Sequence, residues 1–332
     1  MAIHMGRREF IATLGGAAAW PLTAHAQQTP RLRRVGILMP FLPTDTEWQS
    51  RVGALRQELQ RLGWTRGGNI EFDERWTTDN MDLVRANCAN LVELHPDAIV
   101  AVGGRVIPVL MQLTPTIPII IPGATDPVGT GYVESLARPG GNVTGFVNME
   151  FSVIGKILAT LKEIAPGISC IAMIYIPDNR LAVAVQHQFE SFAVPLSVEP
   201  IIAPIHGIAD IERAIEALAE QPNSGIFFPG DLTTIALRDR VTAIVARHRL
   251  PAIYSDRIFV TGGGLVSYDT DRIDIFRRAA SYVDRVLRGE NPGDLPFQQP
   301  TKYRLTINLT TAKALGLTVP LALLARADEV IE

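Results

Sequence analysis

The chain has 332 residues and a formal net charge of −3, and 47% of its residues are hydrophobic and 20% are charged. This composition is ordinary for a globular protein, and the absence of a basic excess gives no reason to expect nucleic acid as a partner. The length suggests about two domains after an N-terminal segment is set aside.

The first residues have the order of an export signal. Arg7 and Arg8 precede an uncharged run over residues 10–24, and Ala24-His25-Ala26 resembles a small-residue cleavage site. The run is shorter than the roughly 20 residues that a membrane span needs. We therefore expect residues 1–26 to be a signal peptide and the mature chain to be a soluble periplasmic protein. The Arg-Arg-x-Phe-Ile sequence is typical of twin-arginine export, but its neighbours depart from the usual pattern, which leaves the route open.

From residue 34 the chain alternates apolar runs of strand length with amphipathic segments. Residues 34–41 are a continuous apolar run, and residues 46–63 place apolar side chains three and four positions apart, as on one face of a helix. The alternation continues to about residue 126 and restarts after residue 142. Continuous apolar strands between amphipathic helices predict parallel sheets covered on both faces. The fold class is therefore α/β, with two doubly wound, Rossmann-like lobes.

The C-terminal part of the chain is too short to form a third domain. We predict that it returns first to the N-terminal lobe and then to the C-terminal lobe. The N-terminal lobe would contain residues 32–143 plus 264–290, and the C-terminal lobe residues 144–263 plus 291–332. The chain would then cross between the lobes three times, which makes a three-strand hinge.

The motifs of common enzymes and of metal sites do not occur in the sequence. It contains no Gly-x-Ser-x-Gly, no Gly-x4-Gly-Lys-Ser/Thr and no His-Glu-x-x-His, and its histidines are scattered. Gly129 and Gly131 lack the third glycine of a dinucleotide fingerprint, because Glu134 stands in its place. Asp269 and Asp271 flank a predicted helix start and are interpreted as capping residues. We expect no enzyme activity, no cofactor and no metal.

The C-terminal ends of the strands are the expected ligand site, since open α/β sheets bind ligands there. Arg105 follows Gly103-Gly104 at a predicted helix N-terminus, where it would bind a ligand carboxylate bidentately; a surface arginine paired with an aspartate is the alternative. Phe41 and Leu42 would pack against an apolar ligand body. The candidate ligand-binding residues are Phe41, Leu42, Gly103, Gly104, Arg105, Ala124, Asp126, Asn179, Asp231 and Ser255.

Several segments, taken in order, resemble blocks of one protein family. They are RREFIATLGGAAAWPL, ARPGGNVTGF, PAIYSDRIFVTGGGLVSY and LPFQQPTKYRLTINLTTAKALGLTVP followed by LLARADEVIE. The chain resembles the periplasmic substrate-binding proteins of ABC transporters, in the group that includes binders of tryptophan and other aromatic amino acids. The resemblance covers nearly the whole chain and implies a type I periplasmic-binding-protein fold.

The resemblance also implies a function and some site residues. Asn179 and Asp231 occupy positions similar to the family's ligand-facing Asn and Asp, so Asp231 would receive a ligand amine. Arg105 and the two residues after it replace the small hydroxyl residues that are usual there. We expect a monomeric extracytoplasmic receptor that closes by population shift on an amino acid or related carboxylate and delivers it to a membrane permease. The alternative is an exported enzyme that acts on a small metabolite with the same two-lobe scaffold.

Overall fold

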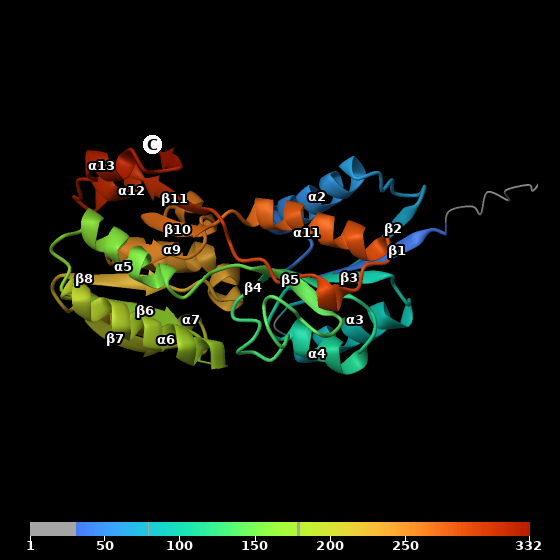
Figure 1. The fold of residues 1–332 in the computed structure, drawn as a ribbon. Coiled ribbons are helices and arrows are strands. Elements are labelled where there is room, and N and C mark those ends of the chain that lie inside the picture. The colour runs from blue at the N-terminus through green and yellow to red at the C-terminus, as the bar shows by residue number, and fades with distance from the viewer. Residues whose placement is uncertain (1–30, 79, 178–179) are drawn as a thin grey trace, which may run out of the picture. The chain divides into compact units, whose positions relative to one another are not determined.

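A computed structural model describes residues 31–78, 80–177 and 180–332 (Figure 1). Residues 33–332 form one compact unit. The predicted signal peptide, residues 1–26, lies outside the described residues. Among the helices of the described part, none is both long enough and apolar enough to cross a membrane.

The first lobe is built on a five-stranded parallel sheet in the order β2-β1-β3-β4-β5. Its strands are β1 (Arg33–Met39), β2 (Ile70–Trp76), β3 (Ala98–Ala101), β4 (Ile119–Ala124) and β5 (Val143–Val147). Its helices are α2 (Thr46–Arg61), α3 (Met81–Glu93), α4 (Val106–Leu113) and α11 (Arg272–Leu287).

Alternate side chains of β1 enter two different cores. Ile37 and Met39 pack with the apolar residues of α2 and α11, whereas Leu38 packs with those of α3 and α4. Figure 1 shows the two helix pairs on opposite faces of the sheet. The lobe is therefore covered on both faces, as its apolar strands require.

The second lobe is built on a seven-stranded sheet in the order β12-β11-β10-β9-β8-β6-β7, in which only the β10–β11 pair is antiparallel. Its strands are β6 (Cys170–Tyr175), β7 (Glu199–Pro204), β8 (Ser224–Phe228), β9 (Ala252–Tyr254), β10 (Val266–Thr270), β11 (Tyr303–Asn308) and β12 (Glu329–Ile331). Its helices are α5 (Val153–Ile164), α6 (Arg180–Ala193), α7 (Ile208–Ala219), α8 (Leu232–Ala236), α9 (Arg238–Arg247), α10 (Ile258–Thr261), α12 (Leu309–Ala314) and α13 (Leu321–Leu324). The prediction of two α/β lobes with parallel sheets is confirmed, with this one antiparallel addition.

Three of the predicted lobe boundaries differ from the structure. Residues 143–147 form β5 in the first sheet, so the chain leaves that lobe after residue 147 rather than at 143. Residues 266–270 form β10, which pairs with β9 and β11 in the second sheet, although the sequence assigned 264–290 to the first lobe. α11 returns to the first lobe, and the segment after it also packs there. The N–H of Gly140 donates to the carbonyl of Gly293 at 3.2 Å, and the N–H of Phe297 donates to the carbonyl of Leu136 at 2.7 Å, although the sequence assigned residues 291–332 to the second lobe. The sequence of a strand or of a connecting segment does not indicate which of two sheets it packs on, which explains these differences.

The three crossings between the lobes are held side by side by hydrogen bonds. The backbone of Gln298 donates to the carbonyl of Gly145 at 3.0 Å and accepts from the N–H of Val147 at 2.8 Å. The hydroxyl of Thr270 donates to the carbonyl of Asn148 at 2.9 Å. The chain therefore passes between the lobes in three adjacent segments, as predicted.

Gly145 allows β5 to lie close to β4 immediately before the hinge. Its φ is +156°, and a Cβ added there would lie 2.2 Å from the carbonyl oxygen of Ile121. No side chain fits at that distance, so this position requires glycine.

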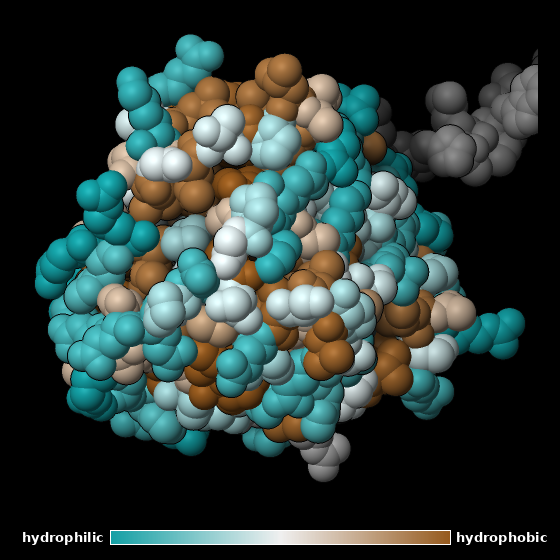
Figure 2. Space-filling model, turned by 90° about the vertical axis from the view of Figure 1, so that its left-hand side faces the viewer, coloured by the Kyte–Doolittle hydropathy of each residue, from teal (hydrophilic) through white to brown (hydrophobic). Residues whose placement is uncertain are grey.

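The surface of the second lobe is mixed in character. Figure 2 shows hydrophilic residues interspersed with hydrophobic ones, and hydrophobic residues gather at its upper edge, where α12 and α13 lie in Figure 1. Leu321, at the start of α13, is 83% exposed.

Candidate functional site

A small polar pocket of about 30 Å³ lies next to the hinge, at the C-terminal ends of strands from both sheets. Thr125 follows β4, Pro229 follows β8 and Ser255 follows β9, so the pocket occupies the place where open α/β sheets bind ligands. The complete lining is Thr125, Asn148, Met149, Pro229, Gly230, Ser255, Tyr268, Asp269, Thr270, Arg272 and Tyr303.

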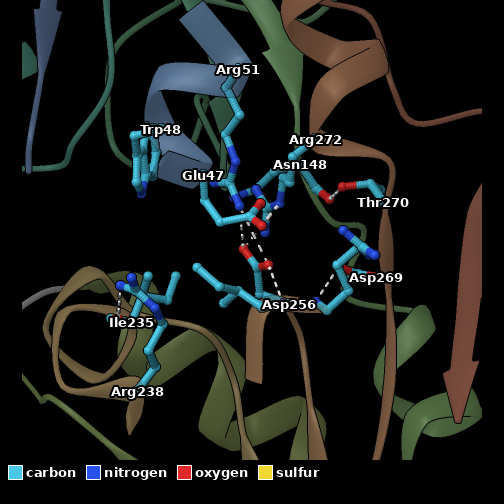
Figure 3. A network of polar contacts seen from close by, with 12 residues as sticks. Glu47, Trp48, Arg51, Asn148, Ile235, Arg238, Asp256, Asp269, Thr270 and Arg272 are labelled. Carbon is cyan, nitrogen blue, oxygen red and sulfur yellow. Dashed lines mark hydrogen bonds and ion pairs between the residues drawn. The ribbon is translucent and has the colours of Figure 1, made fainter. Parts of the chain in front are cut away.

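Beside this pocket, the buried carboxylate of Asp256 forms an ion pair with Arg51 of the opposite lobe (Figure 3). The guanidinium of Arg51, on α2, donates from Nη2 to the two carboxylate oxygens of Asp256 at 3.3 and 3.4 Å. Arg272, the first residue of α11, places Nε 3.8 Å from the same carboxylate, and the N–H of Ile258 donates to it at 3.1 Å. Burial raises the pKa of Asp256, but Arg51 and Arg272 outweigh that effect, and the pKa lies below its ordinary value. Asp256 is therefore ionised.

Asp269 is a second buried carboxyl group, and it lines the pocket. Its Oδ2 accepts the backbone N–H of Arg257 at 2.7 Å, whereas its Oδ1 has no hydrogen-bond partner among the described residues. Burial, and then the negative charge of Asp256, raise the pKa of Asp269 to about 7. Near neutral pH the group is therefore present both with and without its proton.

The pocket also offers hydrogen-bond donors. In the described part of the chain, the Nε of Arg272 and the hydroxyl of Ser255 are buried without a hydrogen-bond partner. A hydroxyl can donate or accept, and a guanidinium only donates. One pocket thus presents a cationic donor group, a titratable carboxyl group and a hydroxyl.

A second ion pair joins the lobes at the N-terminus of α2. Nη1 of Arg238, on α9, lies 3.0 Å from Oδ2 of Asp45. Asp45 also caps α2, because its Oδ1 accepts the backbone N–H groups of Glu47 and Trp48. The Arg51–Asp256 and Arg238–Asp45 pairs therefore both involve α2 or its N-cap, and together with Arg272–Asp256 they show that the lobes are closed on each other in this structure.

Of the nine described candidate residues from the sequence, Ser255 is the one that lines the pocket. Asp231 follows the pocket residue Gly230, but its carboxylate accepts from the N–H groups of Thr233 and Thr234 and caps α8. Burial raises the pKa of Asp231. Asn179 lies outside the described residues.

The candidates of the first lobe do not line the pocket; they serve the fold or are exposed. Phe41 is buried and stacks on Trp48, with 4.7 Å between ring centroids, whereas Leu42 is 59% exposed. Asp126 accepts the N–H of Gly129 at 2.9 Å. Ala124 is buried at the end of β4, Gly103 faces the side chain of Leu232, and Gly104 and Arg105 are exposed at the start of α4.

The sequence interpretation missed the charged residues that dominate this site. The capping role is confirmed for Asp271, which accepts the N–H of Asp274 at 3.0 Å, but it is wrong for Asp269. The sequence did contain a signal for Asp269, since it is the one charged residue in the strand sequence VSYDT. A charge in a buried strand requires a partner, which indicates a functional or structural site. Arg51 and Arg272 gave no such signal, since arginine is common on helices.

Residues 37–331 match the family model described as ABC transporter substrate binding protein. The chain belongs to this family. A relative in the family is a tyrosine-binding protein of Clostridioides difficile (strain R20291), which is 26% identical over 259 residues, covering 78% of this chain and 74% of that protein. The predictions of an ABC-transporter solute receptor and of a type I periplasmic-binding-protein fold are confirmed.

Solved structures of similar fold cover nearly all of the described chain. A conserved domain protein from Vibrio cholerae O1 biovar eltor is 27% identical, with a TM-score of 0.84 over 90% of this chain and 100% of that one. An ABC domain from Streptococcus pneumonia in complex with L-Trp is 22% identical, with a TM-score of 0.83 over 90% of this chain and 99% of that one.

Proposed function

We propose that the protein is a non-enzymatic receptor that captures an amino acid or a related small carboxylate in the hinge pocket and delivers it to the permease of an ABC importer. The observation that carries this proposal is the presence of Arg272, Asp269 and Ser255 in one buried pocket, each with hydrogen-bonding capacity that the described residues do not use. The names of the tyrosine-binding relative and of the L-Trp complex support the choice of ligand class.

The carboxylate of the ligand would bind to Arg272. A guanidinium holds a carboxylate through charge-assisted hydrogen bonds, and these are strong in a site that excludes water. Arg272 stands at the start of α11, where the positive end of the helix dipole also favours an anion. Thr125, Asn148 and Ser255 would supply further hydrogen bonds from both lobes and the hinge.

Binding would favour the closed arrangement by population shift. A ligand that contacts both lobes has a higher affinity for the form in which they meet, and it shifts the equilibrium by that difference. The ion pairs Arg51–Asp256 and Arg238–Asp45 form only when the lobes meet, so they would close together with the ligand. The permease would then recognise the closed receptor.

The predicted signal peptide over residues 1–26 would bring the receptor to the periplasm, and we propose that it acts there as a monomer. The exported enzyme is not favoured, because the family to which the chain belongs consists of substrate-binding proteins.

A thermal-shift screen of the purified mature chain against the twenty standard amino acids and simple carboxylic acids tests the proposal. We expect at least one amino acid to raise the melting temperature in a concentration-dependent way, since a ligand that binds only the folded state stabilises it. Mass spectrometry of the mixture should recover that compound unchanged. Conversion of the compound would contradict the receptor function.

A further inference from the structure

We propose that Asp269 receives a cationic group of the ligand, an amine or a guanidinium, and that its carboxyl group releases a proton to solvent when this group binds. The inference rests on the proposed function, because it concerns the same pocket. It narrows the ligand class to compounds that carry a positive charge close to a carboxylate.

The geometry of Asp269 leaves one oxygen for a ligand. The residue is 4% exposed, its Oδ2 is engaged by the N–H of Arg257, and its Oδ1 is buried without a hydrogen-bond partner in the described chain. An oxygen in this situation has lost its water and is destabilised until a donor reaches it. Since Asp269 lines the pocket, the ligand is the available source of that donor.

The cations around Asp269 are already engaged by other acids. Arg51 and Arg272 both approach Asp256. Arg257 pairs with Glu329 at 2.8 Å. Arg304, which stands opposite Asp269 in the β10–β11 register, pairs with Asp271 at 3.1 Å and lies 3.8 Å from Glu329. The rings of Tyr268 and Tyr303, which also line the pocket, are stacked on each other, and the ammonium group of Lys156 lies 4.8 Å from the centroid of the Tyr268 ring.

The balance of buried charge then depends on the ligand. Arg51 and Arg272 contribute two positive charges, and Asp256 contributes one negative charge. With a ligand that carries a carboxylate and no amine, the buried charges sum to zero when Asp269 is protonated. With a zwitterionic ligand, whose own net charge is zero, they sum to zero when Asp269 is ionised. The cationic group of that ligand then faces a carboxylate rather than a neutral acid. Unbalanced charge in a buried site is expensive, so the two kinds of ligand should select opposite protonation states.

The proton exchange is stoichiometric. In the free protein at low pH, the carboxyl O–H of Asp269 carries the proton. When the cationic group arrives, that O–H bond breaks, the proton passes to bulk water, and an N–H of the ligand donates to the carboxylate. The ligand keeps all of its own protons. At a pH near the midpoint, about half of the molecules release a proton on binding.

Isothermal titration calorimetry in buffers of different ionisation enthalpy measures this release. The probes are two matched pairs: L-tyrosine with 3-(4-hydroxyphenyl)propionate, and L-alanine with propionate. For the amino acid that binds, we expect release of about half a proton at pH 7 and about tenfold weaker binding at pH 6 than at pH 8. Its partner without the amine should bind more tightly at pH 6 than at pH 8. In Asp269→Asn the proton release and the pH dependence should disappear.

The outcomes separate this inference from the proposed function. An amino acid that binds the unaltered protein without proton release and with equal affinity at pH 6 and pH 8 would overturn the role of Asp269 and leave the receptor function standing. Failure of every amino acid and carboxylic acid in the thermal-shift screen to bind would overturn both. The proton count is measured on the unaltered protein, so it does not depend on the folding of the Asp269→Asn variant.

Discussion

Arg51 of the first lobe and Asp256 of the second form an ion pair of 3.3 Å whose side chains are 4% and 0% exposed. The guanidinium of Arg51 also lies 4.5 Å from the centroid of the Trp48 ring. Each charge has given up its water, so each depends on the other while the lobes are closed. When the lobes separate, both charges regain water. The pair therefore links the closure of the lobes to the presence of both side chains.

Removal of Arg51 should open the lobes of the ligand-free protein. In Arg51→Ala, Asp256 would keep only Arg272 as a cationic partner, and the loss of one partner of a buried pair typically costs about 3–5 kcal/mol. Since opening hydrates Asp256, we expect the open population to rise and the radius of gyration in small-angle X-ray scattering to increase.

The matched control is Arg326→Ala, which removes an ion pair with Glu163 inside the second lobe. Both partners are partly exposed there, so neither the stability nor the scattering should change appreciably. Equal radii of gyration for Arg51→Ala and the unaltered protein would show that the Arg51–Asp256 pair does not hold the lobes together.

The pKa of Asp269 predicts how stability depends on pH. An aspartate in the unfolded chain titrates near pH ~3.9, and Asp269 in the folded protein titrates near pH 7. Between these values the folded state holds the extra proton, so this group's contribution to stability falls as the pH rises from about 4 to 7. Asp269→Asn removes the effect, and the melting temperature of this variant should fall less than that of the unaltered protein between pH 5 and pH 7.

The control is Asp239→Asn, at a side chain that is 86% exposed, and it should leave the dependence of the melting temperature on pH unchanged. An Asp269→Asn profile parallel to the unaltered one would argue against the raised pKa.

Gly145 should tolerate no side chain. In Gly145→Ala the new methyl group would meet the backbone of Ile121 at 2.2 Å, in a conformation that alanine avoids. We expect a loss of at least ~2 kcal/mol in the free energy of unfolding, measured by urea denaturation. Gly141→Ala is the control, because no atom lies within 4 Å of an added Cβ there. Similar stabilities for the two variants would contradict the close approach of β5 to β4.

Ligand affinity should depend on Arg272 more than on Arg105. Hydrogen bonds to a charged group are worth about 1.5–3 kcal/mol, so Arg272→Met should weaken the binding of a carboxylate ligand by roughly 10–100-fold. Arg105 is exposed at the start of α4, and we expect Arg105→Ala to change the affinity by less than about threefold. Titration calorimetry measures both, with circular dichroism to confirm that Arg272→Met is folded. A large loss confined to Arg105→Ala would restore the prediction made from the sequence.

The fold could be predicted from the sequence because it follows from an apolar pattern that is local and repeats along the chain. Alternation such as that of Ile37, Leu38 and Met39 between two covered faces follows from the apolar pattern of a single strand. The assignment of β10 to the second sheet was not accessible, because it depends on pairing with β9 and β11. The site was harder for the same reason. Strand ends located Ser255, whereas Arg51 lies 205 residues from Asp256 in sequence, and only the folded chain brings them together.

The closed lobes should hold an unaltered amino acid. Native mass spectrometry of the mature chain, incubated with the amino acid that gives the largest thermal shift, measures this. We expect a one-to-one complex from which the same amino acid is recovered intact after denaturation. Recovery of a different compound, or a complex that persists undiminished in Arg272→Met, would contradict it.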